Sequence, residues 1–90
     1  PTIVGFNTKI VKDEIRAFPN PSSTKVNIIS SKAFTSIEVF DVLGNKITTI
    51  KQSGNNYTLN VSEWKTGVYN AILYNNGIIG NCKIIVNHWG

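Results

Sequence analysis

The chain has 90 residues, a length that suits one domain with one modest core. Its composition, 41% hydrophobic and 16% charged, excludes the charge-rich make-up of disordered chains, and no apolar run approaches the ~20 residues of a transmembrane helix. The formal net charge is +4, but Lys and Arg are spaced along the chain with acidic residues among them, so we expect no nucleic-acid partner.

Residues 1–9 differ from the rest by their scattered apolar residues and small polar ones, and we interpret them as a linker that can add an edge strand. The start lacks the basic residues and apolar run of a signal peptide, so we expect any export signal to lie upstream. Residues 10–90 show no internal repeat and no second compositional zone, which predicts a single domain.

Helical spacing fits poorly throughout, whereas short runs rich in Val, Ile, Thr, Tyr and Phe recur between clusters of Asn, Gly, Ser and Pro. The predicted strands cover residues 10–17, 25–30, 36–42, 46–51, 57–61, 68–74 and 78–86. Seven short strands at this spacing predict an all-β fold, an Ig-like antiparallel β-sandwich of two packed sheets.

Three connections carry strong turn chemistry, because Asn and Gly accept the positive φ that tight hairpins require. They lie at residues 44–45, 54–56 and 75–77. Each is predicted to join antiparallel neighbours, and Asp41 beside the first is predicted to accept backbone N–H bonds.

Alternation along the strands predicts which side chains face the core, since every second residue of a strand points to the same side. On this basis Cys82 shares a face with Ile84 and Val86, and we predict a buried, unpaired thiol. The predicted core is Val26, Ile28, Val39, Leu59, Val61, Tyr69, Ala71, Leu73 and Ile84.

The sequence offers no catalytic arrangement. Its one histidine, His88, is expected to be a solvated side chain near the end, and one cysteine plus one histidine are too few strong ligands for zinc. The five acidic residues are expected on polar strand faces or in turns, and no glycine-rich phosphate loop occurs. We therefore predict no enzyme, no metal and no cofactor.

A carbohydrate-binding site is an alternative, because aromatic side chains on a sandwich can form a stacking platform. Five residues are candidates for it: Tyr57, Trp64, Tyr69, Tyr74 and Trp89. Exposure of Trp64, Tyr74 and Trp89 on one face would favour sugar binding, whereas inward packing of Trp64 and Tyr69 would disfavour it.

Four segments occur in an order that resembles one family. Residues 18–23 read FPNPSS, where two prolines fix φ and withhold N–H donors, so that one strand stops before the next begins. Residues 37–47 hold a strand, Asp41, a glycine turn and another strand, residues 61–69 end in Gly-Val-Tyr, and residues 83–87 read KIIVN. Together they resemble the type A C-terminal sorting domains of the type IX secretion system of Bacteroidetes.

The resemblance implies a non-catalytic sorting signal that directs an upstream cargo across the outer membrane, for cleavage and cell-surface anchoring or release. The implied partners are the outer-membrane translocon and the surface sortase, and the implied location is secreted or cell surface, by way of the periplasm. An Ig-like accessory module that binds carbohydrate or protein is the alternative function. The residues matched to family motifs are Pro19, Asn20, Pro21, Gly44, Gly67, Tyr69, Lys83, Ile85 and Val86.

Among these residues we expect two kinds of role. The prolines and glycines are expected to act through the fold, because prolines restrict the chain and glycines permit strained turns. Lys83, on the polar face of the last strand, is expected to contact the secretion machinery directly.

Overall fold

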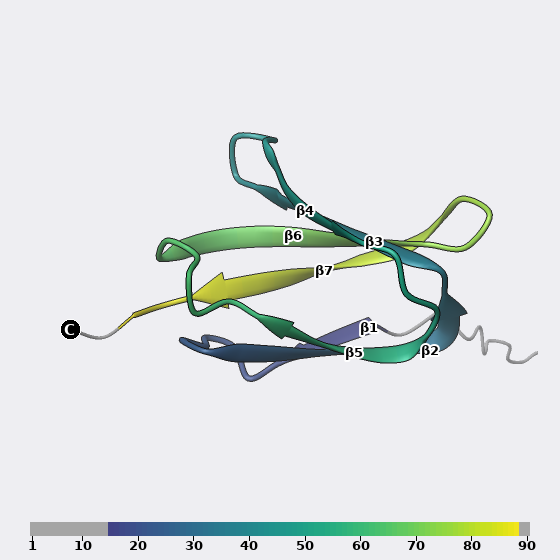
Figure 1. The fold of residues 1–90 in the computed structure, drawn as a ribbon, viewed down its shortest axis with the longest axis horizontal. Coiled ribbons are helices and arrows are strands. Elements are labelled where there is room, and N and C mark those ends of the chain that lie inside the picture. Colours follow the sequence, from purple (N-terminus) through teal and green to yellow (C-terminus); the bar gives the residue numbers. More distant parts are fainter. Residues whose placement is uncertain (1–14, 89–90) are drawn as a thin grey trace, which may run out of the picture.

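Two antiparallel sheets face each other in a computed structural model that describes residues 15–88 (Figure 1). The strands are β1 (Ile15–Phe18), β2 (Lys25–Phe34), β3 (Ser36–Asp41), β4 (Lys46–Ile50), β5 (Gly54–Asn60), β6 (Gly67–Tyr74) and β7 (Ile78–Val86). The structure confirms the predicted all-β sandwich of seven strands. None of the described residues forms a helix long and apolar enough to cross a membrane.

One sheet has the strand order β1-β2-β5 and the other has the order β4-β3-β6-β7. Two of the three predicted hairpins are confirmed, because β3 pairs with β4 and β6 pairs with β7, both antiparallel. Positive φ angles occur where the turn chemistry predicts them, at Gly44 (88°), Asn76 (56°) and Gly77 (123°).

The third predicted hairpin, at residues 54–56, is wrong. These residues begin β5, and β5 belongs to the other sheet from β4, so the connection carries the chain across the sandwich. Gly54 pairs with Phe34 of β2 and has a φ of 150°. Because glycine adopts such positive φ angles readily, it permits the bend at which the chain enters the second sheet.

The core lies between the sheets, and all nine residues predicted for it are buried. Cys82 and Val86 are buried on the same face of β7 as Ile84, as predicted. The prediction missed Phe34 and Ile37, which are also fully enclosed. Phe34 was missed because β2 runs on beyond residue 30, past a shift in its register with β5 that breaks the simple alternation.

The N-terminal predictions fall partly outside the described residues. The structure places β1 at Ile15–Phe18, whereas the predicted strand covered residues 10–17. Residues 10–14 and the predicted linker at residues 1–9 lie outside the described part of the chain.

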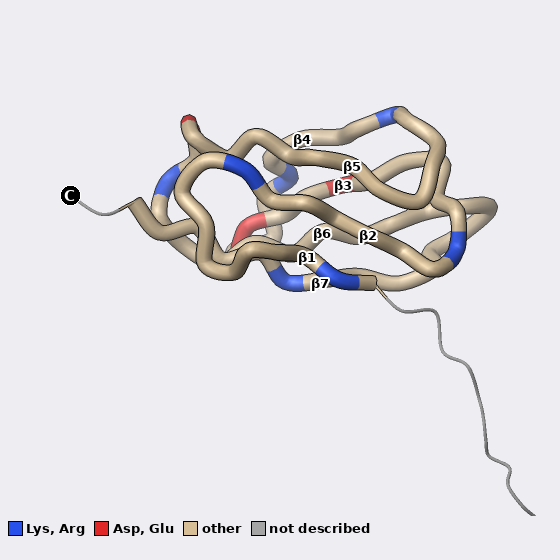
Figure 2. The backbone as a smooth tube through the Cα atoms, turned by 90° about the horizontal axis from the view of Figure 1, so that it is seen from below, with Lys and Arg blue, Asp and Glu red and all other residues tan. Residues whose placement is uncertain are grey.

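Charged residues are spread over both sheets and their loops (Figure 2). This distribution in space agrees with the even spacing of Lys and Arg along the chain, and within residues 15–88 no single strand or loop gathers the positive charge.

Candidate functional site

The turn from β1 to β2 holds the first group of motif residues, Pro19, Asn20 and Pro21. Both prolines follow cis peptide bonds, and because proline has no N–H, β1 ends as Pro19 begins. The Asn20 side chain donates from Nδ2 to the Ala17 carbonyl oxygen at 2.9 Å, the local bond that its position between the prolines suggests.

The same side chain also reaches the last strand. Asn20 Nδ2 donates to the Lys83 carbonyl oxygen at 3.0 Å, and Asn20 Oδ1 accepts from the Ile85 amide at 2.9 Å. One donor and one acceptor thus meet the backbone of β7 at alternate residues, as a neighbouring strand would. The carboxamide of Asn20 therefore covers part of the outer edge of β7.

Ser22 continues this cover with its backbone. Its amide donates to the Ile85 carbonyl oxygen, and its carbonyl oxygen accepts from the Asn87 amide, both at 2.9 Å. Ser22 thus forms a parallel bridge with Val86, and it is itself buried. Because an open edge strand is a template for unwanted pairing, Asn20 and Ser22 together protect β7 from Lys83 to Asn87.

The neighbouring strand β6 carries the next two motif residues. Gly67 pairs with Val86, and Tyr69 pairs with Ile84. The Tyr69 hydroxyl donates to the Lys65 carbonyl oxygen at 2.6 Å, which satisfies the polar end of an otherwise buried ring. Tyr69 therefore fixes the loop before β6 to the core.

The role expected for Gly67 does not follow from the structure. Gly67 does not have a positive φ, and a Cβ there would lie 4.0 Å from its nearest neighbours, the Lys65 carbonyl oxygen and the Tyr69 ring. That distance is an ordinary contact, so no steric reason for glycine is visible at this position.

Gly44, by contrast, has the role expected of it, within the hairpin from β3 to β4. Asp41 Oδ1 accepts from the amides of Leu43 and Asn45, each at 2.9 Å, as predicted for this carboxylate. The backbone amide of Asn45 is the main reason that the pKa of Asp41 lies below its ordinary value. These bonds and the positive φ of Gly44 give the hairpin one defined shape.

Lys83 is exposed on the outer face of the four-stranded sheet, opposite the core side of β7. It is aligned with Asn70 of β6 and, one strand further, with Phe40 of β3. Within residues 15–88 its ammonium has no hydrogen bond or ion pair.

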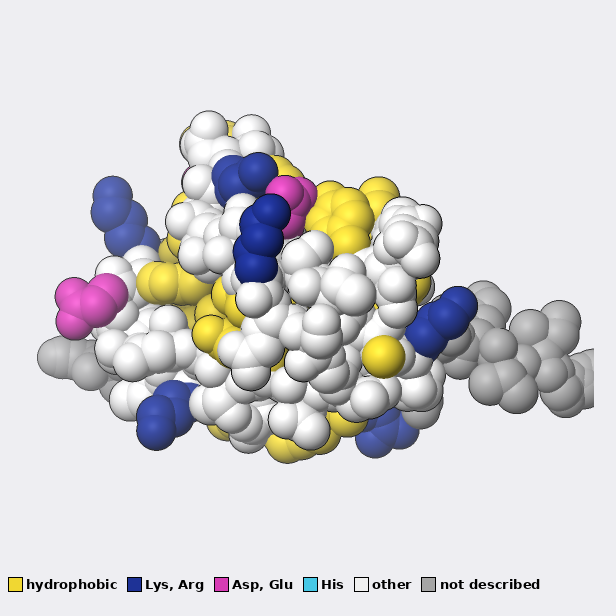
Figure 3. Space-filling view, turned by 45° about the vertical axis from the view of Figure 1, so that its right-hand side comes forward, with side chains coloured by type: hydrophobic (Ala, Val, Ile, Leu, Met, Phe, Trp, Pro, Cys, Tyr) yellow, Lys and Arg dark blue, Asp and Glu magenta, His cyan; other side chains and the backbone are white. Residues whose placement is uncertain are grey.

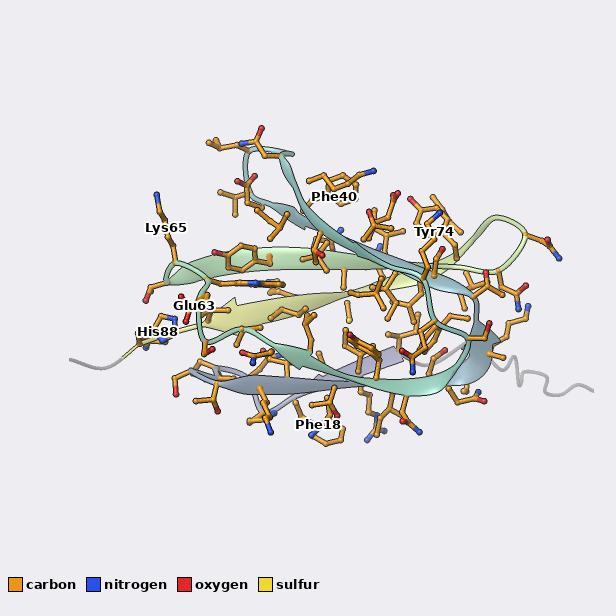
Figure 4. The ribbon with its side chains drawn as sticks, viewed as in Figure 1. Phe18, Phe40, Glu63, Lys65, Tyr74 and His88 are labelled. Carbon is orange, nitrogen blue, oxygen red and sulfur yellow. The ribbon has the colours of Figure 1, made fainter. Side chains whose placement is uncertain are left out.

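Three of the four candidate aromatic residues that the structure describes, Tyr57, Trp64 and Tyr69, pack against or within the core and do not form an exposed platform. Trp64 is partly buried, packs against the core and stacks on Tyr69 with ring centroids 4.8 Å apart at 51°. Tyr74 lies on the outer side of the four-stranded sheet with Phe40 (Figure 4). Trp89 lies outside the described residues. Trp64 and Tyr69 pack inward, as the sorting interpretation expects.

The side chains of His88 and Cys82, which could act as a base and a nucleophile, are constrained by hydrogen bonding and by burial. His88 is exposed, but it is less free than predicted, because its Nε2 lies 2.6 Å from the Trp64 carbonyl oxygen and its amide donates to Thr66 Oγ1 at 3.1 Å. Burial raises the pKa of the Cys82 thiol to about 11, so it is not a ready nucleophile. Among residues 15–88, no three His, Cys, Asp or Glu side chains lie close enough together to hold a metal ion.

The structure thus joins motif residues that are far apart in the sequence. Asn20, from the first motif, is bonded to the backbone of Lys83 and Ile85. Gly44 lies apart, in the β3–β4 hairpin. Sequence reasoning missed Ser22, whose signal was its place directly after Pro21 in the same proline-rich turn.

The described residues thus form a small antiparallel β-sandwich in which the β1–β2 turn covers the outer edge of β7. The sequence matches the secretion system C-terminal sorting domain family over residues 16–87, and the chain belongs to this family of type IX secretion sorting domains. No curated protein and no solved structure gives a significant match.

Membership implies that the chain interacts with the type IX secretion system and that the protein is secreted or displayed on the cell surface. Domains of this family act as sorting signals and are in general not catalysts.

Proposed function

We propose that this domain directs an upstream cargo protein through the type IX translocon across the outer membrane, for cleavage by a surface sortase and anchoring or release. The domain acts as a folded address and performs no chemistry. The observation that carries the proposal is the convergence of the motif residues on β7, where Asn20 bonds the backbone of Lys83 and Ile85.

The motif residues divide into two groups on this proposal. Pro19, Asn20 and Pro21 hold β7 in place and act through the fold. Lys83 is exposed on the outer face, has no partner in the described part of the chain, and contacts the machinery. Ile85 is half-buried beside it, while Val86 is a core residue.

The experiment fuses the full chain to a periplasmic reporter in a host with the type IX system. Surface delivery must depend on that system. Deletion of residues 83–90 removes the end of β7 and is expected to retain the reporter in the periplasm. Because this deletion removes the core residues Ile84 and Val86 and is expected to unfold the domain, Lys83→Ala is measured beside it, with the melting temperature of the isolated chain as the control.

Lys83→Ala removes an exposed side chain, so the melting temperature should stay within about 2 °C of the wild type while delivery falls. Delivery of the C-terminal deletion at the wild-type level would contradict the proposal and favour the accessory binding module.

A further inference from the structure

A hollow of about 200 Å³ lies where the β3–β4 hairpin meets β6 and β7. We call it the hairpin hollow, and its lining is Asp41, Val42, Val68, Tyr69, Asn70 and Lys83. An apolar cavity of about 150 Å³ is enough to hold benzene, so this hollow takes one large apolar side chain.

Three apolar side chains at this end of the sheet are exposed to solvent. Val42 is 75% exposed, Leu43 is 82% exposed and Val68 is 40% exposed. Single exposed apolar residues are common, but three beside one hollow form a patch of the kind that marks an interaction site. On the face that Figure 3 shows, hydrophobic side chains reach the surface in several places, among polar, basic and acidic ones.

The hairpin that presents Val42 and Leu43 has a defined shape before any partner arrives. The Asp41 carboxylate accepts from the amides of Leu43 and Asn45, and the Gly44 amide donates to the Asp41 carbonyl oxygen at 3.0 Å. A preorganised loop loses little conformational entropy when it binds. The hairpin is therefore suited to hold its apolar side chains against another surface.

The positive charge of Lys83 at the hollow indicates which chemical group the partner carries. Lys83 contributes an ammonium with no ion pair in residues 15–88, whereas the carboxylate of Asp41 is occupied by its hairpin bonds. Lys65 projects from the same side of the sheet as Phe40 (Figure 4). A carboxylate therefore complements the Lys83 ammonium. A single lysine in the hollow is not the cluster of basic residues that an anionic lipid surface requires.

We infer that the hairpin hollow docks a protein surface that inserts one apolar side chain beside Val42 and Val68 and places a carboxylate on the Lys83 ammonium. This inference rests on the proposed function, since the protein surface then belongs to the secretion machinery. It assigns the recognition step to the hairpin together with the outer face of β7, and not to the sealed edge of β7.

The test compares matched exposed substitutions in the reporter fusion. Val42→Ser with Leu43→Ser removes the apolar tip, and Lys83→Glu reverses the charge. The controls are Ile78→Ser, at a 65% exposed residue at the start of β7, and Lys25→Glu, at an exposed residue on the other sheet. Melting temperatures of all variants should lie within about 3 °C of the wild type.

We expect surface delivery to fall about tenfold or more for the tip variant and for Lys83→Glu, as it does when a hot spot is lost. Lys83→Arg keeps the charge and should deliver like the wild type, as should both controls. A photo-cross-linker at residue 43 then identifies the partner, and replacing the partner's carboxylate by lysine should restore delivery of Lys83→Glu.

Wild-type delivery of the tip variant would overturn the hollow and leave the sorting function standing. Equal loss in Lys83→Glu and Lys25→Glu would also overturn it, because it would indicate diffuse attraction to an anionic surface. Failure of the unaltered fusion to reach the surface would overturn both proposals.

Discussion

Replacing Asn20 with alanine tests how strongly the β1–β2 turn holds the last strand. The change removes three hydrogen bonds, to the backbone of Ala17, Lys83 and Ile85. A typical intramolecular bond contributes a net ~0.5–1.5 kcal/mol, and Asn20 is exposed, so water replaces part of what is lost. We therefore expect the free energy of unfolding to fall by about 1–3 kcal/mol.

Equilibrium unfolding in urea measures this loss. With a slope of about 1 kcal/mol per M for a small domain, the midpoint should fall by ~1–3 M. Asn56→Ala is the matched control, because this exposed asparagine on β5 has no side-chain bond in the described residues, and it should change stability by no more than about 0.5 kcal/mol. The Ile85 amide should also exchange faster with solvent in Asn20→Ala.

Asn20→Asp separates the two halves of the carboxamide. The carboxylate can still accept from the Ile85 amide, but it faces the carbonyl oxygens of Ala17 and Lys83 without a proton to donate. It should destabilise the domain at least as much as alanine does. If Asn20→Ala unfolds at the wild-type urea concentration and keeps the Ile85 amide protected, the bonds contribute nothing and Ser22 alone closes the edge.

Three further predictions concern the core and the outer face. Leu59→Ala should cost ~2–5 kcal/mol in calorimetry, because Leu59 is only 5% exposed, and a near-neutral result would contradict its burial. The Cys82 thiol, with its pKa raised to about 11 by burial, should react with a bulky thiol reagent only as the domain unfolds, and rapid labelling of the native protein would refute this. The hydrogen bond from the Tyr74 hydroxyl, at 2.8 Å, is the main reason that the pKa of Glu38 lies below its ordinary 4.5, so Tyr74→Phe should raise that pKa in an NMR titration. A lowered pKa stabilises the fold above about pH 4.5, and this stability is lost as the pH falls through the folded-state pKa. The free energy of unfolding of Tyr74→Phe should therefore fall less than that of the wild type when the solution is acidified. An unchanged pKa of Glu38 in Tyr74→Phe would contradict this role.

The strands around the Gly and Asn hairpins could be predicted well from the sequence, because their turn residues mark where each strand ends. The prediction for β7 agrees with the structure at both ends, and β6 differs by one residue. The same turn chemistry failed at residues 54–56, because local residue types do not reveal which sheet the following strand will join.

The candidate site was only partly predictable for a related reason. The bond of Asn20 to Ala17 spans three residues and follows from its position between prolines. Its bonds to Lys83 and Ile85 span 63 and 65 residues, and a sequence shows that an amide can bond but not which distant strand it meets. The hairpin hollow was unpredicted because Val42 was assigned to a strand that in fact ends at Asp41.

The bonds between the β1–β2 turn and β7 make the presence of β7 a condition for the complete fold. Contacts of such sequence separation require closure of nearly the whole domain, and they cannot form while the segment after Lys83 is still being synthesised. A chain broken before this point would lack Ile84 and Val86 from its core and would leave the first half of β6, residues 67–70, without its partner strand. The complete fold therefore requires that β7 has been synthesised as far as Asn87, so recognition of the folded domain, as proposed above, would exclude chains truncated before that residue.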